Sequence, residues 1–189
     1  GIAERWWRYR TLHSAFGMKF WAFVVGAAPL PPDLEEFWRS RGFAVIQGYG
    51  LTETAPIVTL NHPFKTSKGS VGTAIGGVEI EIADDGEILV RGENVTSGYW
   101  GQSEPIYDRD GWLHTGDVGE RDAEGRIFIK GRKKEMIVTP EGLNVFPEDV
   151  ERVLNDLPGV RDSAVVGVTH GAEERVHAVL LLDQPRDPD

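Results

Sequence analysis

The chain has no cysteine and only five histidines among its 189 residues. The absence of cysteine excludes disulfides, thiol chemistry and cysteine–metal sites from this sequence. The histidines are scattered and lack the HExxH spacing of zinc hydrolases, so we expect no zinc site. No apolar stretch approaches the ~20 residues that a membrane-spanning helix needs.

Positive charge is also scarce. There are 20 Lys and Arg residues against 30 Asp and Glu, which gives a formal net charge of −10. Because binding to nucleic acid requires clustered Lys and Arg, we expect no nucleic-acid partner. The one basic cluster, over residues 130–134, is short and includes a glycine, so it calls for a local explanation.

The first residues lack both an initiator Met and the apolar core of a signal peptide. We therefore expect a cytoplasmic location and a chain that is a piece of something longer. A content of 40% hydrophobic and 26% charged residues is ordinary for a soluble globular protein, and the length is sufficient to bury a core.

Residues 1 to about 60 predict a mixed α/β arrangement. Helices are expected over residues 4–16 and again from Pro31-Pro32-Asp33, and strands over residues 20–25 and 43–46. Two strands joined by a helix pair in parallel by default, so we expect a parallel pair here.

From about residue 69 the pattern changes to short strands and tight turns. Apolar residues alternate over 78–82, and Asp84-Asp85-Gly86 then leads into an apolar run over 88–90, which predicts a hairpin. A similar turn over 122–125 precedes a strand over 126–130. This part of the chain is predicted to be β-rich and barrel-like.

The last part returns to mixed structure. Strands are expected over 135–138, 163–168 and 176–182, with a helix that begins at Pro147. Its predicted apolar stripe consists of Val150, Val153, Leu154 and Leu157. The resulting domain prediction is residues 1–65, 66–132 and 133–189.

The segment Gln47-Gly48-Tyr49-Gly50-Leu51-Thr52-Glu53-Thr54 is the most informative part of the sequence. It follows an apolar strand, which predicts a tight glycine turn where backbone can approach a ligand. The Glu53 carboxylate could bind Mg²⁺ and the Thr52 hydroxyl could meet a phosphate, because Mg²⁺ prefers oxygen ligands. An exposed Glu after an ordinary turn is an equal alternative for this segment alone.

Three further segments have similar double interpretations. The small residues of Gly26-Ala27-Ala28-Pro29-Leu30 could lie against a purine, although a plain strand-to-helix turn is the better explanation in isolation. Asp117, in His114-Thr115-Gly116-Asp117, could accept two ribose hydroxyls from a rigid turn, or it could simply stabilise that turn. Arg132 could contact a ribose or phosphate at a domain joint, or belong to a solvated charged face.

Taken together, the order and spacing of GYGLTETAP, GRKKEMIVTPEGLNVFPEDVE and GAAPL are specific. The chain resembles the adenylate-forming superfamily of acyl-CoA synthetases, peptide-synthetase adenylation domains and beetle luciferases. The resemblance covers essentially the whole sequence and is greatest to long-chain fatty-acid–CoA ligases. It implies the end of a large N-terminal domain, made of α/β units and a β-barrel-like subdomain, followed by the start of a small α+β C-terminal domain.

The resemblance also implies a nucleotide site formed by Gly26, Ala27, Ala28, Pro29, Gln47, Gly48, Tyr49, Gly50, Thr52, Asp117 and Arg132. Tyr49 would stack on or flank the adenine, Thr52 would contact the phosphate, and Glu53 would hold Mg²⁺. Asp117 would bind the ribose hydroxyls with the assistance of Arg132.

Two further roles follow from the resemblance. Lys134 would be the hinge about which the small domain rotates between two half-reactions, and Gly142 would lie on a loop near the pantetheine channel. ATP would activate a fatty acid or another carboxylate as acyl-AMP, and CoA would then accept the acyl group. The resemblance to fatty-acid ligases leaves peripheral contact with a membrane open, although no segment resembles an interfacial helix with a basic face.

Two alternatives remain at this point. One is an adenylation domain for an amino acid or aryl acid that loads a carrier protein, although Lys at the predicted hinge is less typical of that group. The other is a nucleotide-binding module without chemistry.

The family's Ser/Thr/Gly-rich phosphate loop and its C-terminal catalytic Lys do not occur in residues 1–189. The resemblance implies that the catalytic Lys lies beyond Asp189, so no catalytic residue is assigned within this chain. Residues 1–189 alone are predicted to have no adenylation activity. Measurable ATP–pyrophosphate exchange by this polypeptide would contradict the prediction.

Overall fold

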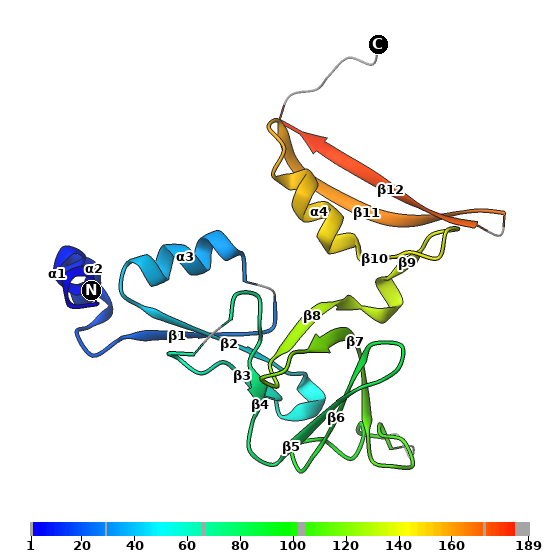
Figure 1. The fold of residues 1–189 in the computed structure, drawn as a ribbon, viewed down its shortest axis with the longest axis horizontal. Coiled ribbons are helices and arrows are strands. Elements are labelled where there is room, and N and C mark those ends of the chain that lie inside the picture. The colour runs from blue at the N-terminus through cyan, green and yellow to red at the C-terminus, as the bar shows by residue number, and fades with distance from the viewer. Residues whose placement is uncertain (1, 29, 66, 102–104, 172, 184–189) are drawn as a thin grey trace. The chain divides into compact units, whose positions relative to one another are not determined.

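A computed structural model describes residues 2–28, 30–65, 67–101, 105–171 and 173–183 (Figure 1). The chain separates into two compact units. The first unit consists of residues 1–115 and 119–129, and the second of residues 116–118 and 130–189. No helix of the described residues is both long and apolar enough to cross a membrane.

The first unit begins with helices and a parallel strand pair. Its elements are α1 (Ile2–Arg8), α2 (Arg10–Phe16), β1 (Ala22–Val25), α3 (Pro32–Ser40) and β2 (Ala44–Tyr49). The parallel register, from Ala22 opposite Ala44 to Val25 opposite Gln47, confirms the expected strand–helix–strand unit. The prediction of one helix over 4–16 was wrong, because Tyr9, at φ −106° and ψ 26°, departs from helical geometry and separates α1 from α2.

Short antiparallel strands extend this sheet. After β2 come a 3₁₀ turn η1 (Thr52–Thr54), β3 (Thr59–Leu60) and β4 (Thr73–Ala74), and the sheet order is β1-β2-β3-β4. Tyr49 lies opposite Thr59 in the antiparallel β2–β3 pair. The strand therefore continues to Tyr49, and the expectation of a turn from Gly48 was wrong.

The β-rich region forms a second sheet with the order β5-β6-β7-β8. Its strands are β5 (Val78–Ile82), β6 (Glu87–Gly92), β7 (Leu113–Arg121) and β8 (Ile127–Arg132). Ile82 lies opposite Ile88, and Gly86 adopts φ +86°, which confirms the predicted hairpin. A left-handed backbone of this kind favours glycine because an added Cβ would be strained.

An apolar cluster holds β2 and the β-rich region of the first unit together. Val58, Ile88, Val90 and Ile127 are fully buried, and Tyr49, only 9% exposed, packs with them. Full burial of one such side chain contributes about 1.5–3 kcal/mol to stability. This core fixes the point where the chain leaves β2.

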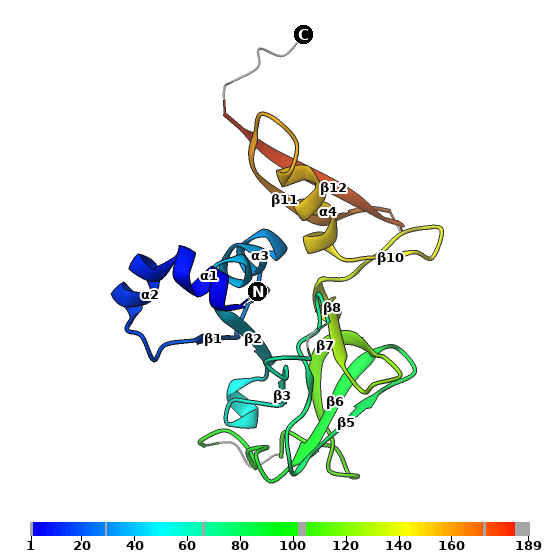
Figure 2. The same cartoon turned by 60° about the vertical axis from the view of Figure 1, so that its left-hand side comes forward.

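The second unit is built on a long hairpin. Its elements are η2 (Lys133–Glu135), β9 (Ile137–Val138), β10 (Asn144–Val145), α4 (Pro147–Asn155), β11 (Val160–His170) and β12 (Glu173–Leu182). β11 and β12 are antiparallel, and α4 packs beside β11 (Figure 2). Proline stands in the first turn of α4, as predicted. The predicted strand over 135–138 is shorter, because Lys133–Glu135 forms a 3₁₀ turn.

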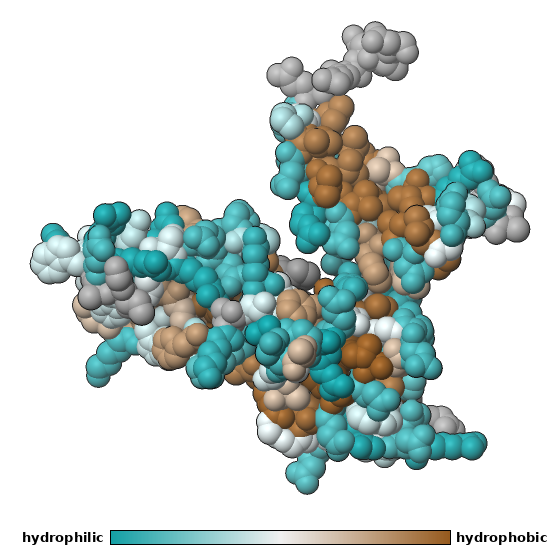
Figure 3. Space-filling model, in the orientation of Figure 1, coloured by the Kyte–Doolittle hydropathy of each residue, from teal (hydrophilic) through white to brown (hydrophobic). Residues whose placement is uncertain are grey.

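Much apolar surface of the second unit is exposed. Apolar residues gather over α4, β11 and β12 in Figure 3. Val153 of α4 is 63% exposed, so the predicted apolar stripe is only partly covered. Leu157, the last residue predicted for that stripe, is 48% exposed and lies beyond the helix, which ends at Asn155. Val179 and Leu181 of β12 are also largely exposed.

A buried histidine joins α2 to the rest of the first unit. His13 has no exposed surface and stacks between the rings of Trp6 and Phe43, with centroids 4.2 Å away on each side. Its Nε2 donates a hydrogen bond of 2.9 Å to the carbonyl oxygen of Arg41. The imidazole therefore contributes both packing and a partner for a main-chain acceptor.

Replacing this ring should weaken the fold of the first unit. His13→Ala removes both ring contacts and the donor to Arg41, so we expect a loss of about 2–4 kcal/mol in the free energy of unfolding. Urea denaturation of the wild type and the variant measures this loss. Thr11→Ala, at an exposed position of the same helix, is the control and should change stability by less than about 0.5 kcal/mol. Equal effects of the two substitutions would contradict the assigned role of His13.

Candidate functional site

The carboxyl ends of β1 and β2 bring together two of the predicted nucleotide segments. Gly26 follows β1, and a Cβ added there would lie 3.3 Å from the carbonyl oxygen of Gly48 in β2. Gly26, Ala27 and Ala28 are exposed, and Ala27 has φ +70°. Ligands of α/β sheets commonly bind beyond the carboxyl ends of parallel strands, so this edge is a candidate binding surface.

Two positions named in the sequence predictions lie outside the described residues. One is Pro29, which was expected to line the nucleotide together with the residues just before it. The other is Asp189, beyond which the catalytic Lys is expected. Both expectations therefore stay predictions.

Gln47, at the same edge, is oriented by a helix. Its Nε2 donates to Oε2 of Glu35 in α3 at 3.1 Å, and Oε1 of Glu35 lies 2.8 Å from Nε of Arg39. The amide of Gln47 is therefore part of a short polar chain that links β2 to α3. Its predicted contact with a nucleotide stays a prediction.

The two glycines of the octapeptide have a packing reason. A Cβ on Gly48 would lie 2.9 Å from the carbonyl oxygen of Thr59, and one on Gly50 would collide with the main chain of Pro56. Both positions therefore exclude side chains without any ligand being present. The side chain of Tyr49, between them, packs in the apolar core. Its predicted stacking on adenine stays a prediction.

The turn after β2 places Thr52 and Glu53 at its surface. Thr54 is fully buried, where its Oγ1 accepts a hydrogen bond from N–H of Leu51 and donates one to the carbonyl oxygen of Leu51, both at 2.9 Å. Thr52 is exposed and Glu53 is half-buried. The internal bonds of Thr54 fix the turn and leave the two predicted ligand-binding residues at its outer side.

A segment that sequence reasoning missed holds this turn from the other side. Nδ2 of Asn94 donates to the carbonyl oxygens of Thr54 and Ile57 at 2.9 Å each, and N–H of Thr96 donates to that of Glu53 at 2.8 Å. The Tyr99 hydroxyl donates to Oε1 of Glu53, and this hydrogen bond raises the pKa of Tyr99 above its usual range. No local sequence signal reveals these contacts, because their partners are 37 to 46 residues apart along the chain.

The chemistry of this turn fits a Mg²⁺ ion. Glu53 offers carboxylate oxygens at a half-buried position. Among the described residues, no three His, Asp or Glu side chains gather as a metal site. Mg²⁺ commonly binds through one or two carboxylates, with waters and substrate phosphates as its other ligands. A single carboxylate beside the candidate binding surface is compatible with that mode.

Asp117 and Arg132 form an ion pair within the second unit. Nε of Arg132 lies 3.0 Å from Oδ1 of Asp117, whose side chain is only 7% exposed, whereas that of Arg132 is 43% exposed. The expectation of a turn over residues 114–117 was wrong, because these residues lie in β7. Gly116 has φ +72° inside the strand, which only glycine adopts readily.

The pair suits recognition of hydroxyl groups. A carboxylate accepts hydrogen bonds from several directions, and a guanidinium offers five N–H donors. Their predicted contact with a ribose stays a prediction, as does the hinge role of Lys134, which lies exposed in η2.

Two carboxylates lie beside the imidazole of His114. Nδ1 of His114 lies 3.2 Å from Oε2 of Glu87, and Nε2 lies 3.3 Å from Oδ2 of Asp108. The hydrogen bond with Glu87, followed by that with Asp108, raises the pKa of His114 above its usual 6.5. Asp108 also accepts hydrogen bonds from the N–H groups of Trp112 and Asp110, which lower its own pKa.

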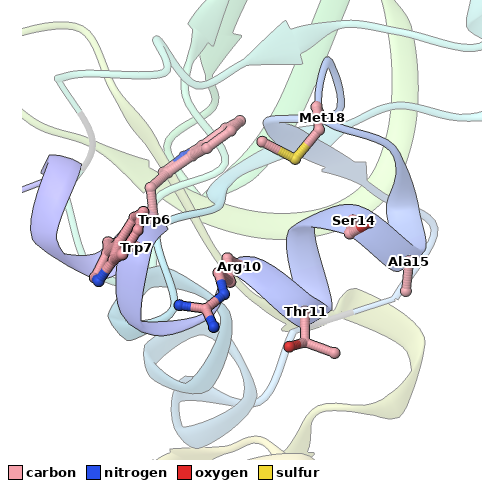
Figure 4. Close-up of a pocket in the computed structure, with 7 residues that line it drawn as sticks. All are labelled: Trp6, Trp7, Arg10, Thr11, Ser14, Ala15 and Met18. Carbon is pink, nitrogen blue, oxygen red and sulfur yellow. The ribbon is translucent and has the colours of Figure 1, made fainter.

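An open apolar hollow of about 1000 Å³ lies on α1, α2 and the residues just after them. Figure 4 shows its lining residues, which are Trp6, Trp7, Arg10, Thr11, Ser14, Ala15 and Met18. None of the predicted nucleotide or metal residues lines this hollow.

Comparison with known proteins identifies the family to which this chain is similar. Residues 8–100 match the family model described as AMP-binding enzyme. The chain is 41% identical over 177 residues to long-chain-fatty-acid–CoA ligase FadD15 of Mycobacterium bovis, covering 93% of this chain and 29% of that protein. It is 40% identical over 159 residues to feruloyl-CoA synthase of Amycolatopsis sp, covering 77% and 32%. The chain thus spans less than a third of either relative.

A solved structure shows the same fold. O-succinylbenzoate coenzyme A synthetase (MenE) of Bacillus subtilis, in complex with ATP and a magnesium ion, is 33% identical to this chain with a TM-score of 0.77. The match covers 88% of this chain and 37% of that one. The similarity confirms the predicted fold class, an α/β and β-rich region followed by α+β structure.

The two carboxylates beside His114 generate a prediction about pH. Because the folded pKa is raised above 6.5, the protonated imidazole stabilises the fold below pH 6.5, and this contribution is lost as pH rises through the folded pKa. We expect NMR titration to give a His114 pKa above 6.5, and Glu87→Gln to lower it. Urea denaturation should show that stability falls as pH rises from 6.5 through the folded pKa of His114. His114→Gln should abolish this fall. A His114 pKa at or below 6.5 would contradict the prediction.

Proposed function

Because the chain belongs to the AMP-binding enzyme family, we propose that the protein carrying it is an ATP-dependent acid–thiol ligase. The observation that supports this proposal most directly is the turn after β2. It holds Thr52 and Glu53 beside the carboxyl edge of a parallel strand pair, where Gly26, Ala27 and Ala28 are exposed. An adenine nucleotide would lie over that edge with its phosphates toward the turn.

The residues of the chain would then divide the work of binding ATP. Thr52 would donate its hydroxyl hydrogen to a phosphate oxygen, and Glu53 would hold Mg²⁺. Asp117 would accept the hydrogens of the ribose hydroxyls, with Arg132 holding the carboxylate in place. Mg²⁺, when bound, would offset the negative charge of the phosphates.

The reaction would proceed in two steps. A carboxylate oxygen of the substrate attacks the α-phosphorus of ATP, the bond from that phosphorus to the bridging oxygen breaks, and pyrophosphate leaves acyl-AMP behind. The thiolate sulfur of CoA then attacks the acyl carbonyl carbon, the bond from that carbon to the phosphate oxygen breaks, and AMP departs. Binding groups fixed before the reaction lower the barrier by positioning the reactants and by electrostatic stabilisation.

A long-chain fatty acid is the proposed substrate, because the similarity to FadD15 extends over 93% of the chain. The similarity to feruloyl-CoA synthase makes an aryl acid the second candidate. Thioester formation by the complete protein with a panel of fatty and aryl acids distinguishes the two. A nucleotide-binding module without chemistry would form no thioester with any of them.

Removing the charge of Asp117 should weaken ATP binding in the complete protein. Asp117→Asn loses a charge-assisted acceptor for the ribose hydroxyls, and such a hydrogen bond is worth about 1.5–3 kcal/mol. Because each 1.4 kcal/mol is about a factor of ten, we expect a roughly 10- to 100-fold fall in kcat/KM for ATP. ATP–pyrophosphate exchange measures this value.

The matched control is Asp84→Asn, at an exposed turn position of the first unit, which should leave kcat/KM unchanged. Thermal unfolding establishes that both variants are folded. A folded Asp117→Asn protein with unaltered kcat/KM for ATP would contradict the ribose role of Asp117.

A further inference from the structure

The segment from Asn94 to Tyr99 contacts both the main chain of the turn Thr52–Thr54 and the side chain of Glu53 within it. Asn94 holds the carbonyl oxygens of Thr54 and Ile57, so it spans the turn from one side to the other. Thr96 donates its N–H to the carbonyl oxygen of Glu53 at 2.8 Å. The Tyr99 hydroxyl donates to Oε1 of the same residue. Glu53 is thus held at its backbone and at its carboxylate by one segment.

We propose that Tyr99 is a positioning residue for the Glu53 carboxylate, orienting it for a divalent cation bound together with the phosphates of a nucleotide. This inference rests on the proposed function, because it assigns Tyr99 a role toward the metal ligand of that same site. Tyr99 does not touch the cation in this role. It acts through Glu53.

The need for such a residue follows from the flexibility of a glutamate side chain. Glu53 projects from a short 3₁₀ turn and is only half-buried, so packing alone restricts its rotamers weakly. A hydrogen bond from a phenol selects the orientations in which Oε1 faces Tyr99. Ordering the carboxylate before the cation arrives reduces the conformational entropy that binding must overcome.

The hydrogen bond is compatible with cation binding. A carboxylate has two oxygens and about four lone-pair positions, so a donor at Oε1 does not exhaust its capacity as a ligand. The phenol O–H is a neutral donor and brings no charge that would repel Mg²⁺. Hydrogen bonds from outer groups to metal-binding side chains are a general means of fixing ligand orientation.

The hydrogen bonds of Asn94 and Thr96 hold the main chain of the turn next to Tyr99. Asn94 and Thr96 hold the turn independently of the phenol, so removal of the Tyr99 hydroxyl should leave the backbone of Thr52–Thr54 in place. Tyr99→Phe therefore tests the orientation of the carboxylate separately from the fold of the turn. Tyr107→Phe is the matched control, since the hydroxyl of Tyr107 makes no hydrogen bond within the described part of the chain and Tyr107 is 39% exposed.

The experiment measures Mn²⁺ binding to the complete protein in the presence of ATP by electron paramagnetic resonance. We expect Tyr99→Phe to weaken Mn²⁺ binding by about tenfold, the lower end of the effects seen for outer-shell partners of metal ligands. The Mg²⁺ concentration for half-maximal ATP–pyrophosphate exchange should rise by a similar factor, while the rate at saturating Mg²⁺ changes little. Tyr107→Phe should match the wild type in both measurements.

Glu53→Gln separates failure of this inference from failure of the proposed function. If Glu53→Gln leaves Mn²⁺ binding unchanged, Glu53 is not a metal ligand, and both proposals about this turn fail. If Glu53→Gln weakens Mn²⁺ binding and Tyr99→Phe leaves it unchanged or strengthens it, only the positioning role of Tyr99 is overturned.

A double variant and an unfolding measurement exclude a purely structural effect. If Tyr99 acts through Glu53, adding Tyr99→Phe to Glu53→Gln should weaken Mn²⁺ binding no further, because the two residues share one interaction. Thermal unfolding of Tyr99→Phe should match that of Tyr107→Phe. A lowered unfolding temperature with unchanged metal affinity would assign Tyr99 a structural role and overturn the inference.

Discussion

Tyr49 ends β2 with its side chain packed among Val58, Ile88, Val90 and Ile127, and the position of the candidate site depends on this contact. Burying an aromatic ring against aliphatic side chains stabilises the fold and also fixes the direction in which the backbone continues. The turn that carries Glu53 begins shortly after this residue. A change in the packing of Tyr49 would therefore move the proposed metal ligand even though Tyr49 itself binds no metal.

The second unit solves a different physical problem. A carboxylate as buried as that of Asp117 costs several kcal/mol when it is left unpaired, and the nearby guanidinium of Arg132 offsets much of this cost. Gly116, just before Asp117 in the strand, adopts a positive φ that favours glycine. The ion pair thus stabilises a charged hydrogen-bond acceptor within β7. An aspartate on a flexible surface loop would have a less defined geometry.

Periodicity and turn chemistry in the sequence were sufficient for much of the fold. The alternation over 78–82 with Asp84-Asp85-Gly86 identified a hairpin, because both signals are local. Local signals failed where distant residues decide the outcome. Gly48 and Tyr49 were expected in a turn, yet pairing with Thr59 and Leu60 keeps them in β2. Likewise, Tyr99 and Asn94 contact the turn Thr52–Thr54 from a segment that only folding brings close to it.

The structure also narrows the part of the octapeptide that requires a function. Side chains at Gly48 and Gly50 are excluded by the chain's own backbone, Thr54 closes the turn internally, and Tyr49 belongs to the core. The fold accounts for each of these residue types without a ligand. Thr52, by contrast, is exposed, and the carboxylate of Glu53 is half-buried and accepts a hydrogen bond from the Tyr99 hydroxyl. Thr52 and Glu53 are therefore the two residues of the segment for which we propose ligand contacts, because their oxygen atoms suit a phosphate and a hard cation.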